Sequence, residues 1–302
     1  MHDLAVPVDG GDLAVPVDSG EFNVWYREAK AGSPTVVLIH GLTGNSRWWT
    51  PVISHLPSDL GLIALDVRGR GASWDAPGPY DLKTIADDVA RCLDHLGVES
   101  GTVVGYSMGA WVANLIGKHR PDRADRLVLV DGGLPIEFDK GLDTEAILDQ
   151  IVGPSLQRIS MEFDTIDDYL GFFSQHPALV ERWDSTLETF LSYDVHQVGN
   201  MWRPRANREA IIQAGYDLTL DPETVSAWRE VEAPTTLLVV DHGMTDQSGG
   251  FIRLETAQEA VAANANIRLR LLEGLNHYTL MFGDGAPLVA EAIVGDGSYR
   301  QV

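Results

Sequence analysis

The chain has 302 residues, of which 44% are hydrophobic, so it can bury a large core and is not a disordered protein. Its 22 Lys and Arg residues against 44 Asp and Glu residues give a net charge of −22, which disfavours nucleic acids and anionic membrane surfaces as partners. No apolar run reaches the roughly 18 residues that span a bilayer, and the N-terminus lacks the pattern of a signal peptide. We therefore expect a cytoplasmic protein with neither a membrane nor a nucleic-acid partner.

The N-terminus carries a near-duplication of nine residues, DLAVPVDGG at 3–11 and DLAVPVDSG at 12–20. Each copy alternates loosely between apolar and polar residues like a short strand, and the DGGD sequence between them is typical of a tight turn. We expect one copy to fold back on the other as a hairpin at the edge of a sheet, where prolines are tolerated.

Downstream of the duplication, apolar runs alternate with helix-like segments. The clearest helix is expected over residues 81–97, which begin with an acidic turn and end on a glycine. Buried strands are expected at 35–40, 61–67, 102–107, 126–133, 235–241 and 267–274. This order predicts an α/β protein with a mostly parallel sheet and flanking helices.

The alternation stops over residues 134–231, which are helix-like, rich in aromatic residues and interrupted by prolines. Because strand patterning resumes at APTTLLVV, we expect a helical cap inserted before the next strand. The core domain would then consist of residues 1–133 and 232–302.

Ser107 lies in GYSMG at 105–109, which fits the pattern G-x-S-x-G between a buried strand and a helix. An abrupt turn from strand to helix strains the backbone of the middle residue and exposes its hydroxyl above the sheet. The free N–H groups of the following helix would stabilise an oxyanion formed there. The pattern therefore predicts a nucleophilic serine.

A nucleophilic serine needs a histidine as base and a carboxylate that orients the histidine. His277 is the candidate base, since it follows the last predicted strand in LLEGLNHYTLMFG. Asp246, in the HGMTD loop after strand 235–241, is the first choice for the acid. Asp131, directly after LVLV, and Asp241, at the end of its strand, remain alternatives.

With these residues in view, the chain resembles the α/β-hydrolase fold family, in its capped serine carboxylesterase and lipase-like branch, from about residue 21 to the end. The order Ser107, Asp246, His277 matches the serine, acid, histidine order of that family. The acid loop VVDHGMTDQSGG departs from the compact turn expected in the family. A serine at the elbow argues against the haloalkane dehalogenase and epoxide hydrolase branches, which need a carboxylate there.

The resemblance also implies an oxyanion hole and two structural elements around it. LIHGLTGN resembles the loop that supplies one oxyanion donor, which would be the backbone N–H of Leu42 beside that of Met108. His40 would then hold this loop instead of acting as a base. In DVRGRGAS, Asp66 and Arg68 are expected to stabilise a sharp turn beneath the site.

These residues together predict hydrolysis of a small carboxylic ester or lactone through an acyl-enzyme on Ser107. Trp48, Trp49 and Tyr106 are expected to bind an apolar acyl or aryl group. No metal or organic cofactor is expected, because the sequence has no H-E-x-x-H, no cysteine pair and no strand-linked G-x-G-x-x-G.

Other functions stay open at this point. The same three residues support C–C bond hydrolysis, perhydrolysis or acyl transfer to an alcohol, since a fold does not determine a reaction. A protein that only binds a ligand in the elbow pocket is the alternative without catalysis. The sequence does not indicate an oligomeric state.

Overall fold

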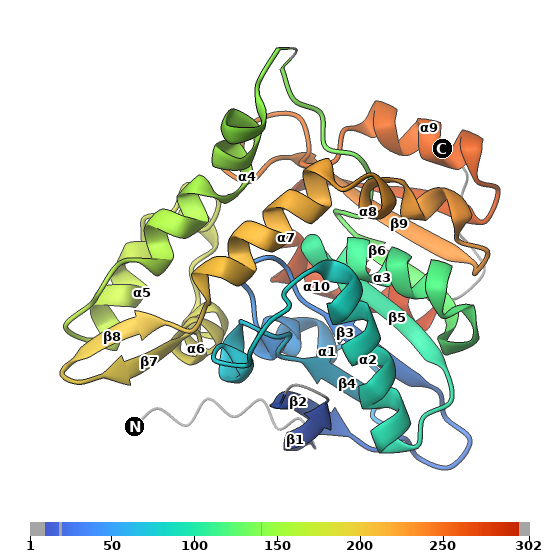
Figure 1. The fold of residues 1–302 in the computed structure, drawn as a ribbon, viewed down its shortest axis with the longest axis horizontal. Coiled ribbons are helices and arrows are strands. Elements are labelled where there is room, and N and C mark those ends of the chain that lie inside the picture. Colours follow the sequence, from blue (N-terminus) through green and yellow to red (C-terminus); the bar gives the residue numbers. More distant parts are fainter. Residues whose placement is uncertain (1–9, 18–19, 140, 296–302) are drawn as a thin grey trace.

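The computed structural model describes residues 10–17, 20–139 and 141–295, and its centre is a sheet of eight strands (Figure 1). The sheet order is β1-β2-β4-β3-β5-β6-β9-β10. The bounds are β1 (Gly11–Val17), β2 (Gly20–Arg27), β3 (Thr35–Ile39), β4 (Gly61–Leu65), β5 (Gly101–Tyr106), β6 (Ala124–Val130), β9 (Thr235–His242) and β10 (Ile267–Asn276). From β4 to β10 all neighbouring strands are parallel, while β2 runs antiparallel to both of its neighbours. The predicted α/β fold with a mostly parallel sheet is confirmed.

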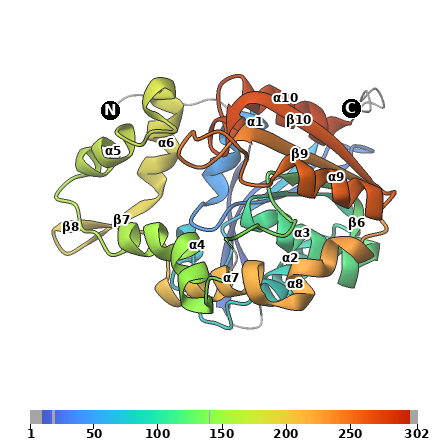
Figure 2. The same ribbon diagram turned by 90° about the horizontal axis from the view of Figure 1, so that it is seen from above.

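Helices cover both faces of the sheet (Figure 2). One face carries α2 (Leu82–Leu96), α3 (Met108–His119) and α9 (Leu254–Ala263), and the other carries α1 (Thr50–Ile53) and α10 (Gly285–Val294). Alternate residues of each strand enter the two cores: Val37 packs in the first, and Val36 and Leu38 pack in the second. This burial on both faces explains why the parallel strands are continuous apolar runs.

The predicted pairing of the two copies of the N-terminal duplication falls largely outside the described residues and stays a prediction. β1, which lies in the second copy, pairs antiparallel with the segment after it, from Gly11 opposite Tyr26 to Val17 opposite Gly20. The first copy lies almost wholly outside the described residues. β2 in turn pairs with β4, so this hairpin forms one edge of the sheet.

The segment between β6 and β9 extends to one side of the sheet (Figures 1 and 2). It contains α4 (Thr144–Ile159), α5 (Ile166–Ser174), α6 (Ser185–Tyr193), β7 (Val195–Val198), β8 (Met201–Pro204), α7 (Arg208–Leu220) and α8 (Pro222–Ser226). Its last residues return to the core, where Trp228 and Val231 pack with the helices of the first face. Residues 134–231 are called the inserted segment below.

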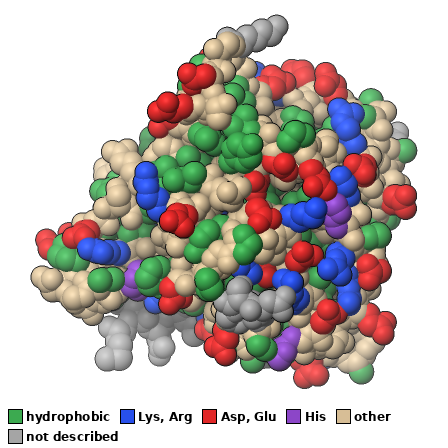
Figure 3. All heavy atoms as spheres, in the orientation of Figure 1, with side chains coloured by type: hydrophobic (Ala, Val, Ile, Leu, Met, Phe, Trp, Pro, Cys, Tyr) green, Lys and Arg blue, Asp and Glu red, His purple; other side chains and the backbone are tan. Residues whose placement is uncertain are grey.

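Acidic side chains are spread over the visible face of the molecule and interspersed with Lys and Arg (Figure 3). This distribution is typical of a charge that keeps a protein dispersed in water, and it does not outline a binding patch. None of the helices in the described ranges combines the length and apolarity needed to cross a membrane.

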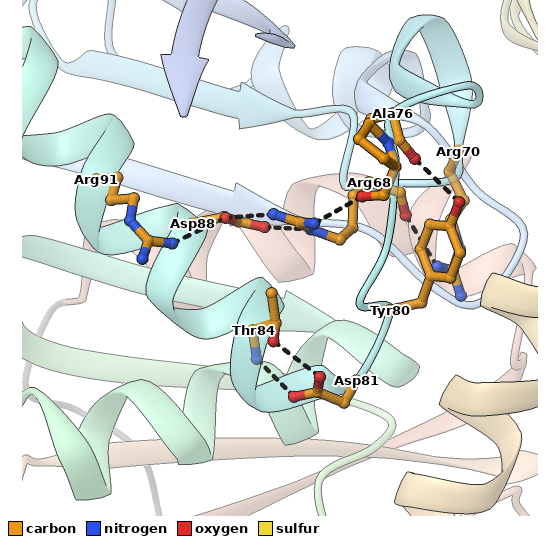
Figure 4. A network of polar contacts seen from close by, with 9 residues as sticks. Arg68, Arg70, Ala76, Tyr80, Asp81, Thr84, Asp88 and Arg91 are labelled. Carbon is orange, nitrogen blue, oxygen red and sulfur yellow. Dashed lines mark hydrogen bonds and ion pairs between the residues drawn. The ribbon is translucent and has the colours of Figure 1, made fainter. Parts of the chain in front are cut away.

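Arg68 and Asp88 form a buried ion pair beneath the carboxyl edge of the sheet (Figure 4). The Arg68 Nε and Nη2 atoms donate to the two Asp88 carboxylate oxygens over 2.6 and 2.8 Å, and both side chains are 2% exposed. Nη1 donates to the carbonyl of Pro77 over 2.8 Å. Burial raises the pKa of Asp88, and Arg68 opposes that rise. The pair attaches the loop after β4 to α2, as the expected structural role of Arg68 requires.

We expect Asp88→Ala to lower the melting temperature by about 5–10 °C, because losing one partner of a buried pair leaves an unpaired buried charge, at a cost of about 3–5 kcal/mol. Asp87→Ala is the matched control: it lies on the same helix, but its pair with Arg120 is 40–46% exposed and contributes at most about 1 kcal/mol. Thermal unfolding followed by circular dichroism would measure both. Equal shifts in the two variants would contradict the role given to Arg68 and Asp88.

Candidate active site

Ser107 occupies a strained turn between β5 and α3. Its φ of 52° and ψ of −123° lie outside the regions that ordinary residues adopt. Its N–H donates to the carbonyl of Val130 at the end of β6 over 2.9 Å, and its carbonyl accepts from Ala110 in the first turn of α3. Ser107 is 9% exposed, so it is largely enclosed by these contacts.

Three glycines allow this turn because the backbone around them is too close for a side chain. A Cβ at Gly105 would lie 2.0 Å from the carbonyl oxygen of Gly109, and a Cβ at Gly109 would lie 2.2 Å from that of Ile39. A Cβ at Gly132 would lie 2.3 Å from the carbonyl oxygen of Ser107. The glycines of G-x-S-x-G are therefore needed for the close approach of β3, β5 and α3.

His277 connects the serine to a carboxylate. Its Nε2 lies 3.1 Å from Ser107 Oγ, and its Nδ1 lies 2.6 Å from Asp131 Oδ2. Both His277 and Asp131 are buried, at 2% and 0% exposure. The second carboxylate oxygen, Oδ1, has no hydrogen-bond partner among the described residues. A buried carboxylate with so few partners is stabilised by a positive charge on its neighbour. Asp131 therefore favours the imidazolium that forms when His277 takes the serine proton, as a base at this position requires.

The expectation that Asp246 is the partner of His277 is therefore wrong in this structure. Asp246 Oδ1 instead accepts a hydrogen bond of 2.9 Å from the side chain of Asn276. Asp241 lies beside His242, 2.9 Å from its Nδ1, and accepts the N–H of Gly274. Among the three acids considered from the sequence, the structure brings Asp131 to the histidine.

Two aromatic rings and a hydroxyl fix the position of His277. The Tyr106 ring stacks on the imidazole with a centroid distance of 5.1 Å, and Phe251 packs at 4.7 Å. The Tyr106 hydroxyl donates to the carbonyl of His277 over 2.8 Å. Because Tyr106 directly precedes Ser107, one residue determines the spacing between the serine and the histidine.

These contacts correct part of the predicted substrate pocket. Tyr106 is 3% exposed and uses its hydroxyl on His277, so it lies under the site. Trp49 is 0% exposed and belongs to the core. Trp48 is 7% exposed and packs against Phe190, at a centroid distance of 4.1 Å, and Phe282, at 4.9 Å. Of the three aromatic residues predicted, Trp48 is the one that borders the inserted segment.

His40 holds the loop that carries Leu42. Its Nε2 accepts the N–H of Val67 over 3.2 Å, so Nδ1 carries the proton and donates to the carbonyl of Gly41 over 2.7 Å. Burial lowers the pKa of His40 to about 4, which keeps the ring neutral near pH 7. A Cβ at Gly41 would lie 3.1 Å from that of Ser107, so this loop contacts the elbow. This geometry agrees with the structural role expected of His40.

Arg70, which the sequence did not single out, supports the same loop from below. Its guanidinium is fully buried and donates to the carbonyls of Leu42, Arg68 and Ala210 over 2.9–3.0 Å. Its Nη2 also lies 3.7 Å from the sulfur of Met108. Burial lowers the pKa of Arg70 to about 9. Arg70 thus connects the two residues expected to supply oxyanion donors with α7 of the inserted segment.

Met108 is the first residue of α3, so its N–H has no carbonyl partner one turn earlier in the helix. The N–H groups of Met108 and Leu42 forming an oxyanion hole remains a prediction. Within the described ranges, no three His, Cys, Asp or Glu side chains lie close enough together to hold a metal ion.

A family model described as the alpha/beta hydrolase fold matches residues 34–182, which contain the elbow, the His40 loop and Asp131. The chain belongs to the α/β-hydrolase fold family. A crystal structure of E-2-(acetamidomethylene)succinate hydrolase matches 94% of this α/β hydrolase and 98% of its own chain, with a TM-score of 0.76 and 21% identity. At that identity the likeness shows the fold alone.

Two relatives are similar in sequence over part of their length. A protein of Caulobacter segnis named as a carbamate hydrolase, RutD, is 35% identical over 104 residues, which are 34% of this chain and 39% of the relative. A 3-oxoadipate enol-lactonase of Acinetobacter baylyi is 27% identical over 170 residues, which are 56% of this chain and 59% of the relative. The matches thus span less than two thirds of either relative.

The pKa of His40 predicts a pH-dependent stability. Between pH 6.5 and 4 the unfolded chain binds a proton at this residue that the folded chain does not, so stability present above pH 6.5 is lost as the pH falls toward 4. The full effect is about 3 kcal/mol. We expect the melting temperature of wild type to fall more steeply over this range than that of His40→Gln, which keeps a donor and an acceptor but does not titrate. Both proteins share all other titrating groups. Parallel curves of melting temperature against pH would therefore contradict the low pKa of His40.

The contact between Asp131 and His277 predicts which acid activates Ser107. We expect Asp131→Asn to slow labelling of Ser107 by a fluorophosphonate about 10³- to 10⁴-fold, because the asparagine favours the wrong histidine tautomer. Asp241→Asn, at the neighbouring strand end, should label within about twofold of wild type, as expected for a residue outside the site. Mass spectrometry of the labelled peptide over time would measure both rates, and a comparable loss in both variants would count against Asp131.

Proposed function

We propose that this α/β hydrolase is a serine hydrolase that cleaves a carboxylic ester or lactone through an acyl-enzyme on Ser107. The observation that supports it is the line of contacts from Ser107 Oγ through the two nitrogens of His277 to Asp131, over 3.1 and 2.6 Å. These are hydrogen-bonding distances for a nucleophile, its base and the group that orients the base.

In the first half of the reaction, Ser107 Oγ attacks the carbonyl carbon of the substrate and its proton passes to His277 Nε2. The Nδ1 proton of the imidazolium stays on the histidine and donates to Asp131, which stabilises the positive charge. The carbonyl oxygen becomes an oxyanion that accepts hydrogen bonds from the N–H groups of Leu42 and Met108, at the positive end of α3.

Collapse of this intermediate expels the alcohol, which takes the proton from His277 Nε2. In a lactone the alcohol remains attached to the acyl group, and in an open ester it leaves. Water then attacks the acyl-enzyme carbonyl and gives a proton to His277. As the bond to Ser107 Oγ breaks, His277 returns this proton to Oγ, which releases the carboxylic acid and restores Ser107.

The acyl side of the substrate would lie beside an aromatic cluster, against Trp48, which is 7% exposed, and the half-buried Tyr278. Trp48, Phe190 and Phe282 pack edge to face or stacked with centroids 4.1–5.3 Å apart, and Tyr278 lies 6.2 Å from Trp48. Such a cluster favours an apolar acyl or aryl group. The Acinetobacter relative is named as a lactonase, which supports including lactones in the proposed substrate class.

C–C hydrolysis, perhydrolysis and acyl transfer use the same three residues, and product analysis separates them from ester hydrolysis. A cytoplasmic location and a small-molecule partner are also part of this proposal.

A series of p-nitrophenyl esters from acetate to decanoate, with a γ- and a δ-lactone beside it, tests the proposed reaction. We expect wild type to hydrolyse several of them and Ser107→Ala and His277→Ala each to lose at least about 10⁴-fold in kcat, because the triad acts as a unit. Trp48→Ala should shift the preferred length of the acyl chain. Trp49→Ala should instead lower the stability of the fold, because Trp49 is fully buried. Hydrolysis by wild type that survives in Ser107→Ala would refute the serine mechanism, and no hydrolysis of any member would refute the substrate class.

A further inference from the structure

Asn276 immediately precedes His277 and is 4% exposed. We propose that Asn276 and Asp246 form a positioning bridge, which holds the His277 loop to the loop after β9 and sets where the imidazole lies. The consequence for catalysis rests on the proposed hydrolase function. Neither residue touches the reacting atoms, so both would act through His277.

The carboxamide oxygen of Asn276 organises the turn that carries the histidine. Its Oδ1 accepts the N–H groups of Tyr278 and Thr279 over 3.0 and 2.8 Å. Its backbone N–H donates to the hydroxyl of Thr279 over 2.9 Å. His277 thus lies inside a closed turn whose two ends are joined by the side chains of Asn276 and Thr279.

The carboxamide nitrogen of Asn276 makes two longer-range contacts. Its Nδ2 donates to the carbonyl of Ala178 in the inserted segment over 3.1 Å and to Asp246 Oδ1 over 2.9 Å. Both protons and the oxygen of the carboxamide are therefore used. Asp246 has a φ of 64°, a strained value for a residue other than glycine, and its carboxylate reaches Asn276 from the loop after β9.

The sheet holds this turn only at its first residue. The register of β10 against β9 shifts after Leu272, and pairing resumes at Asn276, opposite His242. Beyond it, His176 of the inserted segment packs on Tyr278 at a centroid distance of 5.2 Å. The His277 backbone is then held by Tyr106 through its carbonyl and by the contacts of Asn276 through the preceding residue. A displacement of about 1 Å at a reacting group can cost about 10²-fold in rate, so this support affects catalysis.

Asn276→Asp removes the hydrogen bonds of the bridge and keeps those of the turn. The aspartate keeps an oxygen for Tyr278 and Thr279 but loses both donors and adds a negative charge beside Asp246. We expect kcat for the best ester to fall about 10- to 100-fold with KM changed less than about threefold. The loss relative to wild type should shrink as the pH is lowered toward 5, because two adjacent carboxylates then share a proton and restore a hydrogen bond.

Exchanging the two residues provides the decisive comparison. Asp246→Asn alone still offers a carbonyl oxygen to Asn276, so we expect kcat within about threefold of wild type. In the double variant Asn276→Asp with Asp246→Asn, the new asparagine donates to the new aspartate, and kcat should recover at least about fivefold over Asn276→Asp. Asp125→Asn, an exposed aspartate on β6, controls for loss of one negative charge.

Proton NMR of full-length protein labelled with ¹⁵N-histidine adds a readout that needs no turnover. The Nδ1 proton that His277 shares with Asp131 should shift or broaden in Asn276→Asp and return toward its wild-type position in the double variant. If wild type hydrolyses no ester, the proposed function fails while this signal still tests the bridge. The bridge is overturned if Asn276→Asp keeps the wild-type signal, kcat and pH profile, or if the double variant is no better than Asn276→Asp.

Discussion

The candidate site depends on how closely the backbone packs around residue 107. The carbonyl oxygens of Ile39, Ser107 and Gly109 occupy the space where side chains at 109, 132 and 105 would begin. This contact brings β3, β5 and β6 together at their carboxyl ends, and it holds Ser107 in its strained conformation. Each group that the proposed reaction needs comes from a loop that leaves one of these strands or β10. A larger residue at any of the three glycines would separate these loops, since the obstructing atoms are backbone atoms that cannot rotate away.

Buried charged side chains connect these loops where the sheet ends. Arg70 donates to carbonyls of three different segments, and no ion pair with a carboxylate is described for it. Asp66, also fully buried, accepts from the N–H groups of Ser46 and Ala72 and from the Tyr193 hydroxyl over 2.6–2.9 Å. Loops leave backbone groups without partners, and a buried charged side chain can satisfy several of them at once. The cost of burying the charge is offset only while every contact is made, so these connections disfavour partial displacement of the loops.

The inserted segment is attached through the same residues. Arg70 reaches Ala210 in α7, Asp66 reaches Tyr193, and Asn276 reaches Ala178. The segment therefore contacts the side chains that hold the loop of Leu42 and the loop of His277. Movement of this segment would displace both loops, because hydrogen bonds depend on direction and apolar packing adapts more easily.

Much of this architecture could be predicted from local patterns in the sequence. The parallel strands are apolar on both faces. Helix α2 occupies the expected range, with Asp81 as its N-cap and Gly97 as its left-handed C-cap. The pairing of β1 with β2 was not predicted, because β2, GEFNVWYR, mixes polar and apolar residues without a clear period. Arg70 and Asn276 were not recognised as site residues, since their roles come from contacts between segments far apart in the chain. Ser107 and His277 could be identified because each follows a strand in a distinctive local sequence.

The acid could not be chosen in the same way, because Asp131 and Asp246 have equivalent local signals. Both follow a buried parallel strand, and both adopt a positive φ, 45° and 64°. The sheet order decides between them. β6 lies between β5 and β9, so Asp131 is next to the strand that carries Ser107, while the loop after β9 folds on itself through Gly243 and Gln247. A fully buried carboxylate also acts on His277 through a medium of lower dielectric constant than an exposed one at the same distance. Asp131 therefore has the stronger electrostatic effect on His277. The exposed Asp246 binds the side-chain amide of Asn276.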